Sequence, residues 1–133
     1  MSYIDDQDDF LFDIAQLIKF AKLEGFQVTC GEFGREPEMQ LLYYYGFTIQ
    51  EKDGSIELVK RSKRTKTLKS KHLVRRAADL HFFKDKVYIN NLPEAEAKKL
   101  LQPLADYFKS LHPLNKWGGE FKNFFDSPHF ERS

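Results

Sequence analysis

The sequence is poor in several features, and each shortage excludes a class of protein. Cysteine occurs once among 133 residues, as Cys30, which excludes a disulfide framework and any zinc site built from cysteine alone. The 21 basic and 20 acidic side chains nearly cancel, so net charge indicates no particular partner. No apolar run approaches the ~18–20 residues of a membrane span, so we expect no membrane insertion.

Aromatic residues, by contrast, are plentiful. They make up 15% of the chain, with thirteen Phe and six Tyr, and this content excludes intrinsic disorder. The segment 1–6 is acidic where a secretory signal would be basic, so we expect no signal peptide and synthesis in a cytoplasm. To act outside the inner membrane, the chain would then need another protein that permeabilises this membrane.

The pattern of apolar residues predicts a single α+β domain over 1–133, with a core from about 8 to 131. Three segments have helical spacing, over 10–21, 36–45 and 93–108. Three others alternate like strands, over 26–30, 77–83 and 87–89, the last two forming a hairpin. Cys30 ends the first of these strands, and we expect it to be buried. From Glu51 to Lys69 the apolar pattern thins out, with a turn signal at Asp53-Gly54 that is followed by a polar, lysine-rich connection. The tail from Leu111 is predicted to be irregular.

Histidine is scarce, and two of its four copies lie near an aspartate. His72 precedes Asp79 by seven residues, and His129 follows Asp126 by three. Two imidazoles and a carboxylate can occupy three corners of a tetrahedral zinc site and leave the fourth for water. A second carboxylate beside that water can act as general base. Each pair also occurs by chance in proteins without metals, so the spacing alone leaves both the site and its substrate open.

The residues around these pairs resemble two motifs of the zinc peptidases that cut D-amino-acid-containing bonds in peptidoglycan. The motifs are Ser-x-His-x-x-Gly-x-Ala-x-Asp and acid-x-x-His, matched here by Ser70, His72, Ala77, Asp79, Asp126 and His129. Arg35 and Gln40 resemble the family's upstream Arg-x-x-x-x-Gln element, and the run 117–131 is similar to its bacteriophage endolysin branch. One position departs from the family, because Arg75 stands where the first motif has glycine.

The resemblance implies a Hedgehog/DD-peptidase-like fold, with helices packed on a short, mainly antiparallel sheet, and one zinc ion per chain. His72, Asp79 and His129 would hold the zinc, and Asp126 would be the general base. Arg35 would meet a substrate carboxylate or the oxyanion, although an ion pair with a neighbouring glutamate is an equal alternative. Ser70 and Gln40 would lie near the substrate.

Trp117 stands beside Gly118-Gly119, two glycines that permit a close approach of the backbone. We therefore expect this tryptophan to form a wall of the cleft.

The function that the resemblance implies is a peptidoglycan-degrading endolysin that hydrolyses the L-alanyl-D-glutamate bond of the stem peptide. It would act as a monomer in the periplasm after a holin or similar protein permeabilises the membrane. A D-alanyl-D-alanine carboxypeptidase or dipeptidase is the alternative within the same chemistry. A non-catalytic, envelope-binding phage protein is a further alternative, favoured by Arg75 and by the nine basic residues from Lys60 to Arg76. That basic block has no aromatic residues for base stacking, so we expect no nucleic-acid partner.

Overall fold

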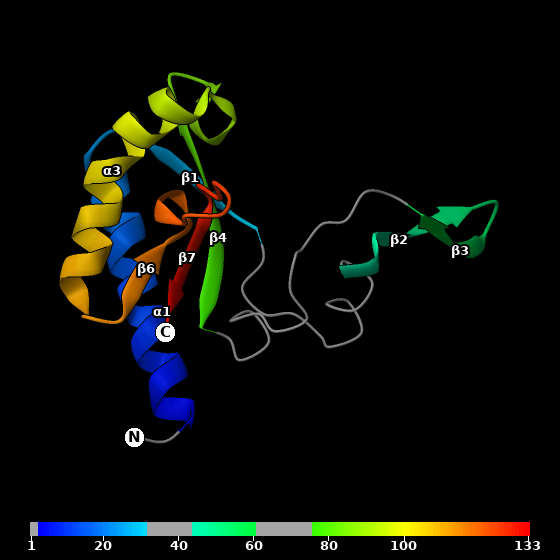
Figure 1. The fold of residues 1–133 in the computed structure, drawn as a ribbon, viewed down its shortest axis with the longest axis horizontal. Helices are drawn as coiled ribbons and strands as arrows, with labels where there is room; N and C mark the ends of the chain where they lie inside the picture. Colours follow the sequence, from blue (N-terminus) through cyan, green and yellow to red (C-terminus); the bar gives the residue numbers. More distant parts are fainter. Residues whose placement is uncertain (1–2, 32–43, 61–75) are drawn as a thin grey trace.

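The computed structural model describes residues 3–31, 44–60 and 76–133 of the chain (Figure 1). Most of the helix predicted over 36–45 lies outside these residues, and so do five of the positions singled out in the sequence: Arg35, Gln40, Ser70, His72 and Arg75. No helix among the described residues is long and apolar enough to cross a membrane.

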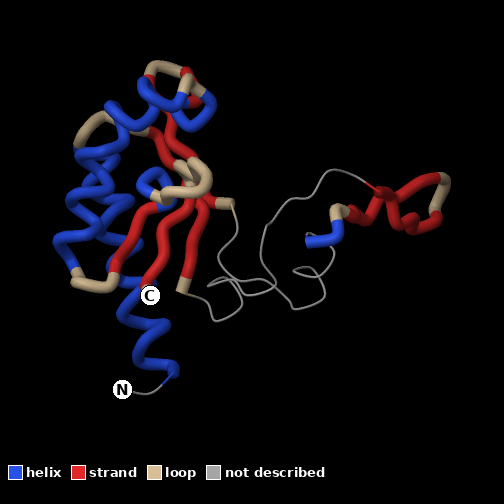
Figure 2. The backbone as a smooth tube through the Cα atoms, in the orientation of Figure 1, coloured by secondary structure: helices blue, strands red, loops and turns tan. Residues whose placement is uncertain are grey.

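Two long helices were predicted correctly. Helix α1, Tyr3–Leu23, has acidic residues in its first turn and ends before Gly25, whose φ of 93° is a left-handed conformation that favours glycine. Helix α3, Glu94–Leu111, begins after Pro93 and continues through Pro103. The two helices contact each other and lie on the same side of the strands in Figures 1 and 2.

The main sheet is antiparallel and has the order β1-β4-β7-β6, with β5 paired to β4. Its strands are β1 (Gln27–Cys30), β4 (Ala77–Lys84), β5 (Val87–Tyr88), β6 (Asn115–Trp117) and β7 (His129–Arg132). The predicted hairpin is confirmed, because β4 pairs with β5 across a turn in which Asp85 and Lys86 both have positive φ. Short 3₁₀ turns follow β5 as η2 (Ile89–Asn91) and β6 as η3 (Gly118–Glu120). The predicted α+β class is confirmed.

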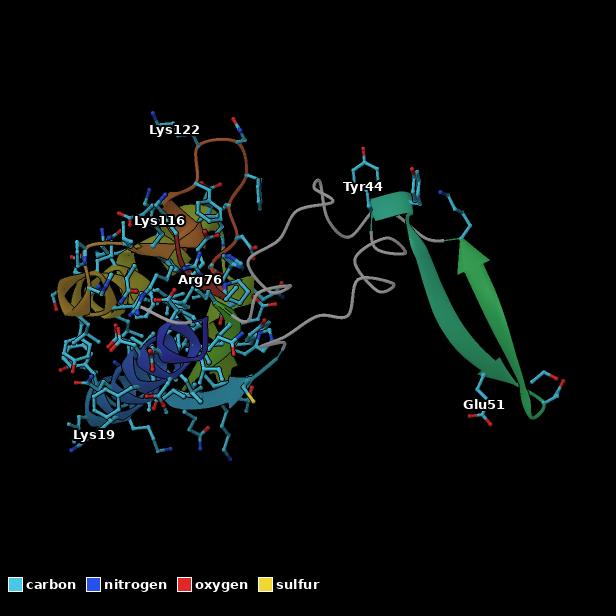
Figure 3. The ribbon with its side chains drawn as sticks, turned by 90° about the horizontal axis from the view of Figure 1, so that it is seen from below. Lys19, Tyr44, Glu51, Arg76, Lys116 and Lys122 are labelled. Atoms are coloured by element: carbon cyan, nitrogen blue, oxygen red, sulfur yellow. The ribbon has the colours of Figure 1, made fainter. Side chains whose placement is uncertain are left out.

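Three sequence predictions differ from the structure. The segment 51–69, predicted to have little regular structure, overlaps a second sheet, formed by β2 (Phe47–Lys52) and β3 (Ser55–Lys60). This sheet stands apart from the main sheet in Figure 1, and Glu51 of β2 is labelled in Figure 3. The tail expected to be irregular contains β6 and β7, two strands of the main sheet. Cys30, expected to be buried, is exposed, because β1 is an edge strand of the sheet.

The two faces of the main sheet have different roles. Alternate residues of each strand point to opposite faces, and one set packs against α1 and α3. The largest buried side chains of this core are Phe10, Ile14, Leu17, Leu80, Phe82, Leu101, Leu104, Phe108, Trp117 and Phe130. The other set, on the outer face of the sheet, includes Asp79, His81, His129 and Glu131. The core therefore fixes the strands that present the polar residues.

Candidate active site

Asp79 and His129 meet on the outer face of the sheet. Strands β4 and β7 pair so that these two residues lie directly opposite each other. The side chains of such a pair point to the same face, and His129 Nδ1 lies 3.4 Å from Asp79 Oδ1. Two residues separated by fifty positions in the sequence thus come together through strand register.

Asp126 approaches the same imidazole from the turn that precedes β7. Its Oδ2 atom lies 4.0 Å from His129 Nδ1, and the backbone N–H of His129 donates to the Asp126 carbonyl at 3.2 Å. Gly118 holds this turn, because its carbonyl accepts from the Asp126 N–H at 3.1 Å. A Cβ on Gly118 would lie 2.2 Å from the Asp126 carbonyl oxygen, so the predicted close approach at this glycine is confirmed.

Glu131 binds the far side of the His129 ring. Its Oε1 lies 2.8 Å from His129 Nε2, and its side chain is 16% exposed. Metal-binding histidines usually give their second nitrogen to a carboxylate or carbonyl, which fixes the ring and its tautomer. This contact was not predicted, although residues 129 and 131 share a face of any strand and that alternation could have revealed it.

Three carboxylates therefore surround one buried imidazole. Burial alone lowers the pKa of His129, but the hydrogen bonds to Asp79 and Glu131, with the charges of Asp126 and Glu131, outweigh it and raise the pKa to about 9. Without a bound cation, a proton on His129 offsets part of this negative charge. A divalent cation beside Nδ1 would do the same.

The described residues fit part of a zinc site. Imidazole nitrogen and carboxylate oxygen are zinc donors, and Nδ1 of His129 faces Asp79 while Nε2 is held by Glu131. No group of three or more His, Cys, Asp and Glu side chains within 3–31, 44–60 and 76–133 could hold a metal ion. The third predicted ligand, His72, lies outside these ranges.

Trp117 supports the site from the core. Its side chain is 1% exposed, which differs from the predicted cleft wall because a buried ring has almost no surface to offer a substrate. Its indole N–H donates to the Ser127 carbonyl at 2.7 Å, and Ser127 Oγ accepts from Asn90 Nδ2 at 2.9 Å. Both bonds hold the segment between Asp126 and His129. Trp117 therefore positions the turn instead of lining a cleft.

Comparisons with known proteins identify a family and a shared fold. The family model for D-alanyl-D-alanine carboxypeptidases, of peptidase family M15, matches residues 63–132. The crystal structure of the Serratia marcescens L-Ala D-Glu endopeptidase ChiX is similar to this chain with a TM-score of 0.55 and 21% identity. The alignment covers 91% of this chain and 78% of that one, and at this identity it establishes a shared fold. No curated protein matches the chain.

The family match spans all four positions of the predicted zinc centre: His72, Asp79, Asp126 and His129. It also spans more than half of the chain. The chain therefore belongs to the D-alanyl-D-alanine carboxypeptidase family, M15, and is a peptidase that acts on peptidoglycan.

Proposed function

We propose that this chain is a zinc peptidase that hydrolyses the L-alanyl-D-glutamate bond of peptidoglycan stem peptides. The observation that carries the proposal is the meeting of Asp79 and Asp126 at His129 Nδ1, at 3.4 and 4.0 Å, on the outer face of the sheet. Peptidases of this family are generally zinc-dependent, and a histidine between two carboxylates supplies both a metal-binding pair and a base.

His72, Asp79 and His129 are the proposed ligands. A bound zinc ion supplies a Lewis acid that lowers the pKa of water, which makes hydroxide available near neutral pH. Glu131 holds Nε2 of His129, so Nδ1 is the nitrogen directed toward Asp79.

Asp126 is the proposed general base. Its carboxylate takes a proton from the attacking water and then gives it to the amine that leaves when the peptide bond breaks. The Gly118 carbonyl and the Ser127 contacts fix the turn that carries Asp126, so the base is held by backbone and core contacts. Arg35 is proposed to meet a substrate carboxylate or the developing oxyanion, with Ser70 and Gln40 near the substrate.

Two bonds are candidates for cleavage. The ChiX endopeptidase, which shares the fold, is named for the L-Ala–D-Glu bond, and this supports that bond as the substrate here. The description of the matching family supports the D-alanyl-D-alanine bond as the second candidate. Both reactions would use the same residues, so only the products distinguish them.

Mass spectrometry of digested peptidoglycan tests the proposal. Purified sacculi are incubated with the protein alone, with a chelator, and with chelator followed by excess zinc. New L-alanine carboxyl ends and D-glutamate amino ends, lost on chelation and restored by zinc, are expected. Asp126→Ala should abolish cleavage while zinc stays bound, whereas Asp106→Ala, which removes an exposed carboxylate of α3, should cleave normally. Release of D-alanine would identify the carboxypeptidase instead, and no cleavage by zinc-loaded protein would refute the enzymatic proposal.

We further propose that the biological role is that of a monomeric bacteriophage endolysin, made in the host cytoplasm and acting in the periplasm. Support comes from the similarity of the run 117–131 to the endolysin branch of the family. Expression in a Gram-negative bacterium should cause lysis when a holin is co-expressed, and the Asp126→Ala variant should not. Lysis by that variant would separate any effect on the envelope from peptidase activity.

A further inference from the structure

His81 lies beside the proposed metal centre on the same face of the sheet. It follows Asp79 by two residues in β4, so both side chains point outward, and its partner across the sheet is Thr29 of β1. Strand β4 lies between β1 and β7 in the sheet, and His81 lies two residues along β4 from Asp79, the partner of His129. The residue is half-buried, so its ring is partly open to solvent.

Gly31 lies close to the side chains of both His81 and Asp79. A Cβ on Gly31 would lie 2.9 Å from His81 Nε2 and 3.3 Å from the Cβ of Asp79, while the Gly31 N–H donates to the Asp79 carbonyl at 2.7 Å. Any larger residue would press a methyl group against the ring nitrogen. Glycine therefore lets the backbone at the end of β1 lie close to the Nε2 edge of the imidazole, next to Asp79.

Tyr88 fixes the orientation of this ring. The β4–β5 register places Tyr88 opposite Phe83, on the face that carries His81, and its hydroxyl lies 2.7 Å from His81 Nδ1. The phenol ring also stacks on Phe83, with centroids 5.0 Å apart. Burial and then the charge of Asp79 raise the pKa of the Tyr88 phenol, which keeps its proton.

In the tautomer in which the Tyr88 hydroxyl donates to Nδ1, the hydrogen of the neutral imidazole lies on Nε2. Among the described residues, no hydrogen-bond partner engages that nitrogen. In that tautomer His81 presents an oriented N–H donor beside the proposed metal centre.

We propose that His81 is a substrate-binding residue whose Nε2–H donates a hydrogen bond to an acceptor oxygen of the peptide, and that Tyr88 is its positioning residue. The ligand is a peptide that presents a carboxylate or carbonyl oxygen next to the bond being cut. This assignment rests on the proposed peptidase function for the identity of its ligand. His81 is not a metal ligand in this proposal, because the hydroxyl of Tyr88 is hydrogen-bonded to Nδ1 and Nε2 is assigned to the substrate.

Kinetics of full-length, zinc-loaded variants test the assignment on a soluble stem peptide. Loss of a hydrogen bond to a charged acceptor is expected to raise KM about tenfold to a hundredfold in His81→Leu, with zinc content unchanged. His81→Gln retains an N–H donor and should recover part of the loss. Tyr88→Phe should give an intermediate KM, because the ring stays but its orientation is no longer fixed.

Matched controls lie on or beside α3, away from the outer face of the sheet. His112→Gln and Tyr107→Phe make the same chemical changes and should leave KM at its original value. A peptide whose D-glutamate carboxylate is converted to an amide distinguishes the two kinds of acceptor. If His81 binds that carboxylate, the amide peptide should have a higher KM than the parent peptide with the original protein. With His81→Leu, the two peptides should have the same KM.

Peptide binding to the Asp126→Ala variant, measured by calorimetry, separates this assignment from the proposed reaction. Weaker binding on adding His81→Leu supports the assignment even if the original protein cleaves nothing. Cleavage with unchanged KM and binding in His81→Leu would overturn the assignment and leave the proposed function standing. Loss of zinc from His81→Leu, or no binding of the peptide to any variant, would also overturn it.

Discussion

Gly118→Ala provides a sharp test of how the candidate site is held. The added Cβ would lie 2.2 Å from the Asp126 carbonyl oxygen and 2.9 Å from the Cβ of His129. A carbon and an oxygen without a bond between them normally lie well over 3 Å apart, so the turn must move by about 1 Å. It cannot move freely, because the Gly118 carbonyl accepts from the Asp126 N–H and the Trp117 indole donates to Ser127.

This movement would displace both Asp126, the proposed base, and His129, a proposed zinc ligand. A misplacement of about 1 Å can cost about a hundredfold in rate, so kcat/KM should fall by about that factor. Forcing a methyl group into a packed region should also lower the free energy of unfolding by about 1–3 kcal/mol. Kinetics on peptidoglycan fragments and urea denaturation measure the two effects.

Gly54→Ala is the matched control. Gly54 has a φ of 78° in the β2–β3 turn, and a Cβ there would meet nothing within 4 Å. Alanine in this left-handed conformation should lower stability by about 1 kcal/mol and leave kcat/KM unchanged. Unchanged kcat/KM and unchanged stability in Gly118→Ala would refute the argument that the close approach of Gly118 to the Asp126 carbonyl positions Asp126.

Four other predictions follow from the described contacts. Arg132 is 2% exposed and pairs with Asp13, which is 5% exposed. Arg132→Met should cost about 3–5 kcal/mol in urea denaturation, because it leaves the buried carboxylate without its cation and with only the Asn115 amide as a partner; the double variant with Asp13→Leu should recover much of it. Glu131→Ala should weaken zinc binding about tenfold to a hundredfold in a chelator competition, and unchanged affinity would show that Nε2 needs no carboxylate. Zinc binding at pH 7 should release about one proton from His129, seen as a buffer-dependent calorimetric heat. The pKa of His129 is raised from 6.5 to about 9 in the folded chain, so its protonation stabilises the metal-free protein fully below pH 6.5. The free energy of unfolding should then fall by up to about 3 kcal/mol as the pH rises through 9, and urea denaturation that shows no change with pH would contradict this.

The helices and β4 could be predicted because each carries its own pattern. Phe10, Ile14 and Leu17 recur at helical spacing and form one buried face of α1. In β4, Leu80 and Phe82 are buried and alternate with the more exposed Asp79, His81 and Phe83, after a start at which Ala77 and Ala78 are both buried. When one helix or strand buries a whole face, the spacing of its apolar residues is enough to predict it.

The missed strands depend on partners far away in the chain. Strands β6 and β7 have three and four residues, too few for a periodic signal, and they form because both pair within the main sheet. The β2–β3 hairpin had a local signal, because Asp53 and Gly54 both have positive φ in its turn. The charged residues of both strands hid the alternation on either side.

The site divides in the same way. Asp79, Asp126 and His129 could be identified from motif spacing, and the structure brings their side chains together. Strand alternation predicts the contact of Glu131 with His129 only once residues 129–132 are assigned to a strand, and the short β7 has no periodic signal of its own. The burial of Trp117 depends on the pairing of Trp117 with Phe130, and no local pattern reports it.

The hydrophobic core determines the geometry of the polar face. In β7, Phe130 is fully buried opposite Ala78, and the next pair in the ladder is His129 opposite Asp79. A slip of one residue between β4 and β7 would turn Phe130 toward solvent and His129 into the core. Exposing one large aromatic side chain costs about 2–3 kcal/mol, and burying an imidazole without its carboxylates adds to that cost. The register that buries the core is thus the register that places His129 Nδ1 beside Asp79, so packing selects the arrangement on which the proposed chemistry depends.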